Sequence, residues 1–196
     1  NNQFKCRNID FFMIVKEENR RDIEQKLIKL GDYIKIDYLS SCLKKPLDFD
    51  TRKFVLLKLS EIYEQKNMFS DSAKMIQLSA SINTTIQGQI SDLIKAGGLF
   101  IKAGNFDLAD SMFDKAFAYA DTIQKVGIKN SKKEMYKKQA ELYLKNDKRK
   151  NAMLAYERLS ELDLDSLERR ETQQRLLSLY EKLGKVKEYF NLKKEI

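Results

Sequence analysis

The stretch from Leu93 to Ala116 constrains the fold most, because two faces of small and apolar residues flank a short turn. The first face has helical spacing, i, i+3, i+4 and i+7, and consists of Leu93, Ala96, Gly97 and Phe100. The second follows the turn at residues 103–106 with spacing i, i+4 and i+7, and consists of Ala109, Phe113 and Ala116. Gly97 and Ala109 allow close backbone approach, and the two phenylalanines fill the remaining space. We therefore predict an antiparallel helical hairpin.

Composition extends the helical prediction to the whole chain. One Pro and seven Gly among 196 residues leave few helix breakers, and 42% hydrophobic with 34% charged residues is ordinary for a globular protein. We predict an all-α fold. Cys6 and Cys42 lack motif spacing and the chain has no histidine, so the sequence excludes a His–Cys zinc site or a Cys–His nucleophile within this chain. We expect neither a metal nor a cofactor.

A marker residue recurs near the end of the first helix of each predicted hairpin. The markers are Leu27, Tyr63, Phe100, Tyr143 and Tyr180, at steps of 36, 37, 43 and 37 residues. Such a period indicates a solenoid, because each hairpin buries only part of its apolar face and must stack on its neighbours. We predict about five hairpins in a repeat domain over residues 17–196. Residues 1–16 are expected to form an N-terminal extension or capping helix.

The central hairpin resembles the tetratricopeptide repeat, in Leu93-x2-Ala96-Gly97-x2-Phe100 followed by Ala109-x3-Phe113. The resemblance implies a right-handed alpha-alpha superhelix whose first helices line a concave groove for a segment of another protein. The chain departs from the family pattern in its steps, which exceed the usual ~34 residues, and it has no tryptophan. Its only proline is Pro46. These departures resemble the longer hairpins of soluble NSF attachment proteins and similar adaptors.

Polar and glycine-containing segments predict the turns. Gly31-Asp32-Tyr33, Asn67-Met68-Phe69 and Asn146-Asp147-Lys148 each separate two periodic segments, and Gly184 precedes the last helix. After Pro46 we expect the next helix to begin near Asp50-Thr51. The longer join from Thr122 to Asn130 is either a hinge or a helix extension.

The family resemblance also points to candidate groove residues, on the side of each first helix away from the marker. Positions five before and two after the markers fall on one line of a helix. For the four markers from Tyr63 onward, seven of these eight positions are basic and none is acidic: Lys58, Lys95, Lys138, Arg175, Gln65, Lys102, Lys145 and Lys182. Neighbouring apolar candidates are Leu57, Ile94, Ile101 and Leu144, whereas Glu61 and Glu141 interrupt the positive field. We predict either a groove for an acidic segment or a merely solvated helix face.

Most of the net charge of +8 lies in one segment, which raises an alternative function. Residues 129–150 hold nine Lys or Arg residues against Glu134, Glu141 and Asp147. This hairpin could bind RNA or an anionic surface. Tyr136 and Tyr143 occupy predicted core positions, however, and are not expected to be stacking platforms.

No enzyme signature appears in the sequence, so we expect a non-enzymatic adaptor that binds another protein or peptide. Gly97-Gly98 lacks the Lys-Ser/Thr of a phosphate-binding loop and is better explained by close packing. The apolar run from Phe11 to Val15 is far shorter than the ~20 residues of a membrane-spanning helix. We predict that it packs on the first hairpin; the rival interpretation is the end of an upstream anchor.

The cellular context is less constrained. The chain opens on Asn1 rather than Met, so we expect that residues precede it and that targeting information is missing. A cytoplasmic location is our working expectation. The client protein and the oligomeric state stay open.

Overall fold

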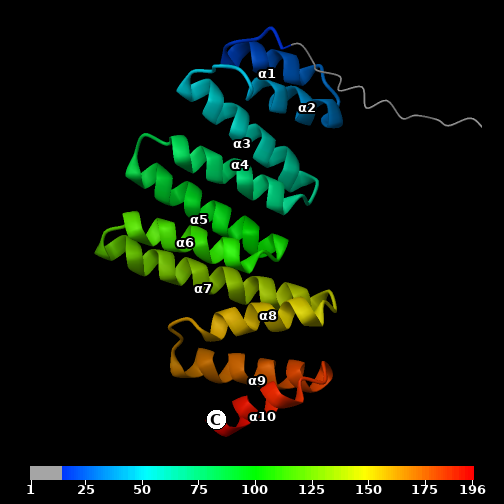
Figure 1. The fold of residues 1–196 in the computed structure, drawn as a ribbon, viewed down its shortest axis with the longest axis vertical. Helices are drawn as coiled ribbons and strands as arrows, with labels where there is room; N and C mark the ends of the chain where they lie inside the picture. Colours follow the sequence, from blue (N-terminus) through cyan, green and yellow to red (C-terminus); the bar gives the residue numbers. More distant parts are fainter. Residues whose placement is uncertain (1–14) are drawn as a thin grey trace, which may run out of the picture.

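The chain folds as a stack of α-helices that follow one another along the long axis of the molecule (Figure 1). The computed structural model describes residues 15–196, and within that range it contains ten helices and no strand. The helices are α1 (Arg20–Ile28), α2 (Asp32–Cys42), α3 (Phe49–Gln65), α4 (Phe69–Ile82), α5 (Ile86–Ala103), α6 (Phe106–Tyr119), α7 (Thr122–Lys145), α8 (Arg149–Ser160), α9 (Ser166–Lys182) and α10 (Val186–Glu195). The predicted all-α fold is confirmed.

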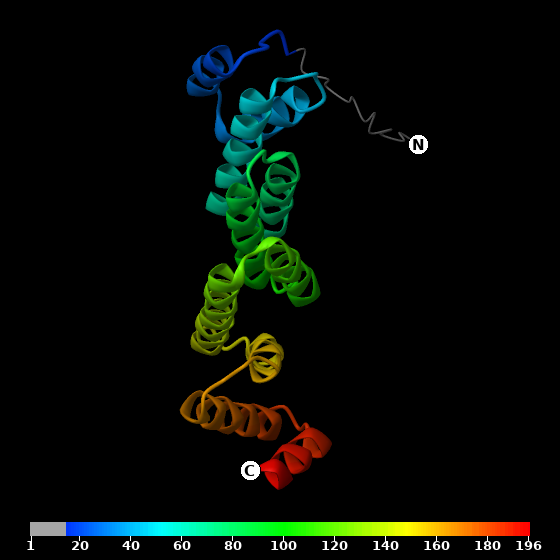
Figure 2. The same ribbon diagram turned by 90° about the vertical axis from the view of Figure 1, so that its left-hand side faces the viewer.

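Helices pack mainly against their neighbours in sequence. The pairs α3–α4, α5–α6, α7–α8 and α9–α10 form hairpins, and α4 also packs closely against α5. From α5 onward, the odd-numbered helices lie on one side of the stack and the even-numbered helices on the other (Figure 2). One face of each odd-numbered helix is therefore left uncovered by its hairpin partner.

Four turns share one backbone geometry, which shows that the hairpins repeat structurally. Each contains a residue with left-handed φ: Asn67 (58°), Gly104 (77°), Asp147 (54°) and Gly184 (67°). The amide of the next residue donates to the carbonyl of the marker residue, at 2.8 to 2.9 Å, in the pairs Met68–Tyr63, Asn105–Phe100, Lys148–Tyr143 and Lys185–Tyr180. This is the 6→1 hydrogen bond that ends helices with a left-handed residue. Four of the five predicted markers therefore occupy equivalent positions, and Leu27 does not.

The first unit departs from this geometry. Gly31 is the N-cap of α2 with an extended backbone (φ −71°), so Asp32 and Tyr33, predicted in the turn, belong to α2. The turn instead precedes Gly31, because this glycine starts the second helix and does not end the first. In addition, α1 packs more closely against α3 than against α2.

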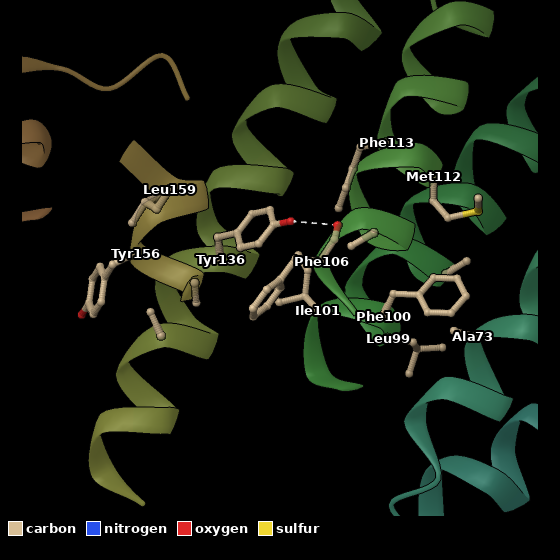
Figure 3. Close-up of a cluster of buried hydrophobic side chains, with 14 of the residues drawn as sticks. Ala73, Leu99, Phe100, Ile101, Phe106, Met112, Phe113, Tyr136, Tyr156 and Leu159 are labelled. Carbon is tan, nitrogen blue, oxygen red and sulfur yellow. Dashed lines mark hydrogen bonds between the residues drawn. The ribbon is translucent and has the colours of Figure 1, made fainter. Parts of the chain in front are cut away.

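The central hairpin has the close approach that the sequence predicts at Gly97, and Phe100 and Phe113 belong to the cluster drawn in Figure 3. A Cβ added to Gly97 would lie 2.7 Å from Cε2 of Phe113, so no larger side chain fits without a shift of the ring. Ala109 and Phe100 are fully buried. At Gly98 the same test gives 2.9 Å to Sδ of Met135 on α7. Close packing, predicted for the Gly97-Gly98 pair, is confirmed.

The structure decides between the two alternatives for the start of α7 and moves the predicted start of α3. Residues 122–130, predicted to be a hinge or a helix extension, form the first turns of α7, which the side chain of Asp121 caps together with Gln124. The predicted helix extension is therefore confirmed. It accounts for the longer step of 43 residues between the markers Phe100 and Tyr143. For α3, Asp48 is the cap, because its carboxylate accepts from the Thr51 amide at 2.9 Å.

The buried side chains form two clusters. The larger extends from Ala73 to Tyr180 and includes the residues of Figure 3, where the Tyr136 hydroxyl donates to the Phe106 carbonyl at 3.4 Å. The smaller extends from Val15 to Leu59. Val15 ends the apolar run predicted to cap the first hairpin and is buried in this smaller cluster. The rest of the run, and most of the predicted N-terminal extension 1–16, lies outside the described residues.

Candidate partner-binding groove

Three of the predicted groove lysines line one hollow between α5 and α7, with a volume of about 470 Å³. Its lining includes Lys95 and Lys102 from α5 and Lys138 from α7. Glu64 of α3 and Phe69 of α4 also line it. We call this space the α5–α7 hollow.

Helical spacing explains why these side chains meet. Besides Ile101, the α5 wall consists of Lys95, Gly98, Leu99 and Lys102, and the α7 wall consists of Met135, Lys138, Gln139 and Leu142. Each set has the spacing i, i+3, i+4, i+7 and so forms a single stripe. Gly98 lacks a side chain, and Met135 from α7 approaches its backbone. The two stripes are therefore opposite walls of one space.

The charges of the α5–α7 hollow are only partly compensated. Nζ of Lys102 lies 2.8 Å from Oε1 of Glu64 and 5.6 Å from the ring centroid of Phe69. Lys95 and Lys138 are exposed, and neither forms an ion pair with any residue in the part of the chain that the structure describes. Two ammonium groups, one from each wall, are thus available to an acidic ligand.

Arg175 lies in a second hollow, of about 320 Å³, among α7, α8 and α9. Ion pairs bridge this space, because Lys133 contacts Glu168 at 2.8 Å and Lys137 contacts Glu171 at 3.8 Å. The hydrogen bond from Lys133 lowers the pKa of the Glu168 carboxyl below its ordinary range. A ligand carboxylate would have to compete with these internal acids. The basic row therefore does not line one continuous hollow.

The remaining polar positions of the row have other surroundings. Lys58 pairs with Glu61 at 2.7 Å within α3. Gln65, Lys145 and Lys182 are exposed and are not among the residues that line either hollow.

Of the four predicted apolar candidates, one lines the α5–α7 hollow. Ile101 is fully buried in the larger core, and it is also among the residues that line the α5–α7 hollow. Leu57, Ile94 and Leu144 are half-buried and pack against the same core. The other apolar residues of the hollow's α5 and α7 walls are Leu99, Met135 and Leu142.

Sequence reasoning missed Leu99 and Leu142, although a local signal marks both. Each follows a groove lysine by four residues, Lys95 and Lys138 respectively, and so lies one turn further along the same face. Leu142 is 47% exposed and is the more accessible of the two.

The basic segment 129–150 carries less free charge than its composition indicates. Lys132 pairs with Asp110 at 2.8 Å, and Arg149 pairs with Asp147 at 2.9 Å. Tyr136 and Tyr143 are buried, which confirms their predicted core positions. Around the α7–α8 turn, Lys145, Lys148 and Lys150 are exposed without an acidic partner among residues 15–196.

Other kinds of site find little support in the described residues. Within residues 15–196 no group of three or more acidic or cysteine side chains could hold a metal ion, and no helix is long and apolar enough to cross a membrane. Cys42 is buried as a free thiol, and burial raises its pKa. Comparison with known proteins gives no matching family model and no matching curated protein.

Proposed function

We propose that this protein is a non-enzymatic adaptor that binds an acidic and apolar segment of another protein in the α5–α7 hollow. One observation carries the proposal: Lys95 and Lys138, both without an acidic partner in the described chain, line the same apolar hollow from successive hairpins. The alternative interpretation, a merely solvated helix face, gives no reason for this arrangement. The two lysines occupy the same position relative to their markers and lie on opposite walls of a space with apolar surface between them.

The arrangement of the helices supports a tetratricopeptide-like superhelix. Four hairpins share the left-handed turn and the marker hydrogen bond. The odd-numbered helices that supply the hollow lie together on one side of the stack (Figure 2). In the family that the central hairpin resembles, this is the side that lines the peptide groove. The first and last units differ most from the pattern, as expected for the ends of a solenoid.

The chemistry of the hollow suits a peptide with both apolar and acidic side chains. Covering exposed apolar surface such as that of Leu142 is favourable by about 25 cal/mol per Å². The two lysines would mainly steer an acidic segment and fix its register, and their effect would weaken as salt is raised. The hollow among α7, α8 and α9 is the poorer candidate because its own carboxylates already hold Lys133 and Lys137.

Selection from a displayed library of random dodecapeptides tests this proposal. Peptides enriched on the natural protein should contain an apolar residue flanked by acidic residues. Replacing Lys95 and Lys138 by Glu should weaken their binding at least about tenfold, because two attractions become repulsions. Neither lysine is in the core, so circular dichroism and thermal unfolding should stay unchanged.

The matched control for this test is Lys145→Glu combined with Lys182→Glu. It makes the same change of net charge on α7 and α9, outside the α5–α7 hollow. Equal loss of binding in both double variants would show that the overall field, and not the hollow, attracts the peptide. Enrichment of peptides without acidic residues would overturn the proposal.

Binding of RNA or an anionic surface is the second candidate. It is favoured by the exposed Lys145, Lys148 and Lys150 around the α7–α8 turn. The buried tyrosines provide no platform on which bases could stack. A complex purified from cells should lose its partner on nuclease treatment if that partner is RNA, whereas a protein partner should remain bound.

A further inference from the structure

We infer that Glu64 is a built-in competitor for the α5–α7 hollow: its carboxylate holds Lys102 in the free protein, and a carboxylate of the bound segment displaces it. This inference rests on the proposed function and adds the regulation and a more specific ligand class. The segment would carry an apolar side chain and three acidic positions, two for the unpaired lysines and one that competes with Glu64.

The geometry places the competing carboxylate within the site. Glu64 and Lys102 come from different hairpins, 38 residues apart, and both line the hollow. Nζ of Lys102 lies 2.8 Å from Oε1 of Glu64, and the side chains are 47% and 35% exposed. Because both groups remain accessible to solvent, a ligand could reach Lys102 without any opening of the core.

The register of the repeat shows that this ion pair is not a general requirement of the fold. The residue after the marker is Glu64 in α3, Ile101 in α5 and Leu144 in α7. The lysine opposite each of these lies two residues after the marker of the next odd-numbered helix. It is Lys102 in α5, Lys145 in α7 and Lys182 in α9. Only the first of these three combinations contains a carboxylate. Lys145 and Lys182 form no ion pair within the described chain, so the later hairpins stack without an ion pair at this register.

The strength of the pair suits an exchangeable contact. Exposed ion pairs contribute only about 0.2–1 kcal/mol, because water and salt screen them and two side chains lose freedom. A ligand carboxylate at Lys102 would therefore replace one weak contact by another and gain little. At Lys95 and Lys138 it would displace nothing. Glu64 thus lowers the affinity for segments with a third carboxylate at Lys102 more than the affinity for segments with only two.

The experiment is a double-mutant cycle with the most enriched acidic dodecapeptide of the selection, labelled with fluorescein and titrated by anisotropy. Glu64→Gln keeps the shape of the side chain and removes its charge. It should tighten binding by about two- to fivefold, the equivalent of one exposed ion pair. The dependence of affinity on salt should become steeper. Lys102→Gln should abolish this gain when combined with Glu64→Gln.

The matched control is Glu61→Gln. Glu61 is exposed on the same helix, pairs with Lys58 at 2.7 Å and does not line the hollow. An equal gain in Glu61→Gln and Glu64→Gln would reduce the effect to net charge and overturn the inference. Normal binding with no gain in Glu64→Gln, or a gain that persists without Lys102, would overturn it while leaving the proposed function intact. Failure of every library peptide to bind would count against both.

Discussion

At the scale of residues, three hairpins carry small buried residues at equivalent positions, twelve residues apart. The pairs are Ser60–Ser72, Gly97–Ala109 and Ala140–Ala152, and all six residues are buried. In the first pair the two hydroxyl oxygens lie 2.8 Å apart, so the polar groups satisfy each other. The last hairpin has Leu177 and Tyr189 at the equivalent positions, both only half-buried. The last hairpin therefore lacks the small buried pair, and its second helix α10 has no fully buried residue.

Enlarging one small residue should test the register of the central hairpin. Ala109 is fully buried on α6, so Ala109→Leu should overpack the core of this hairpin and cost about 1–3 kcal/mol in the free energy of unfolding. Ala118→Leu is the control, because Ala118 is exposed on the same helix. A denaturant titration measures both. Equal stability of the two variants would contradict the packing described for α5 and α6.

At the scale of elements, the ends of the helices are fixed by local chemistry. Asp48, Asp121 and Asp165 cap α3, α7 and α9, each accepting a hydrogen bond from a backbone amide in the first turn. At the opposite ends of these odd-numbered helices, the left-handed residue reverses the chain. The step from Phe100 to Tyr143 is longer because Asp121 caps α7 early, and not because the turn differs.

Two glycine substitutions should separate a turn glycine from a helix glycine. Gly184 has φ 67° and Gly127 lies within α7, and an added Cβ would meet nothing within 4 Å at either site. Gly184→Ala should therefore cost about 1–2 kcal/mol through backbone strain alone. Gly127→Ala should stabilise the protein by about 0.5–1 kcal/mol, because alanine favours the helix. Thermal unfolding would detect opposite shifts, and shifts of the same sign would contradict this assignment.

At the scale of the whole molecule, stability is unevenly distributed along the stack. The larger core joins α4 to α9, whereas the smaller core serves α1, α2 and part of α3. A polar cluster strengthens the centre: Asp110 of α6 accepts a hydrogen bond from Tyr136 of α7 at 2.8 Å and pairs with Arg158 of α8 at 3.3 Å. At the end of the described chain, α10 has no fully buried residue.

Amide hydrogen exchange should follow this distribution. We expect the fastest exchange in α1, α2 and α10, which have few buried contacts, and the slowest between Leu93 and Tyr156, where hairpins stack on both sides. Mass spectrometry of peptic fragments would measure the profile. A uniform profile would indicate a single cooperative unit and would contradict the repeat-like distribution of stability.

The sequence by itself determined the features that depend on spacing and on the size of single residues. The helices, four of the turns and the close packing at Gly97 follow from apolar periodicity, from glycine or polar turn residues, and from small side chains at fixed offsets. The buried positions of Phe100 and Tyr143 follow in the same way. These signals are local, because each is encoded within one helix or one turn.

Only the tertiary structure decided which side chains share the candidate site. The rotation of α5 relative to α7 places Lys95 and Lys138 around one hollow, buries Ile101 and leaves Arg175 in another. It also brings Glu64 to Lys102 across 38 residues. Helical spacing predicts the face of a helix on which a residue lies, but the angle between stacked hairpins depends on the packing of all their side chains together.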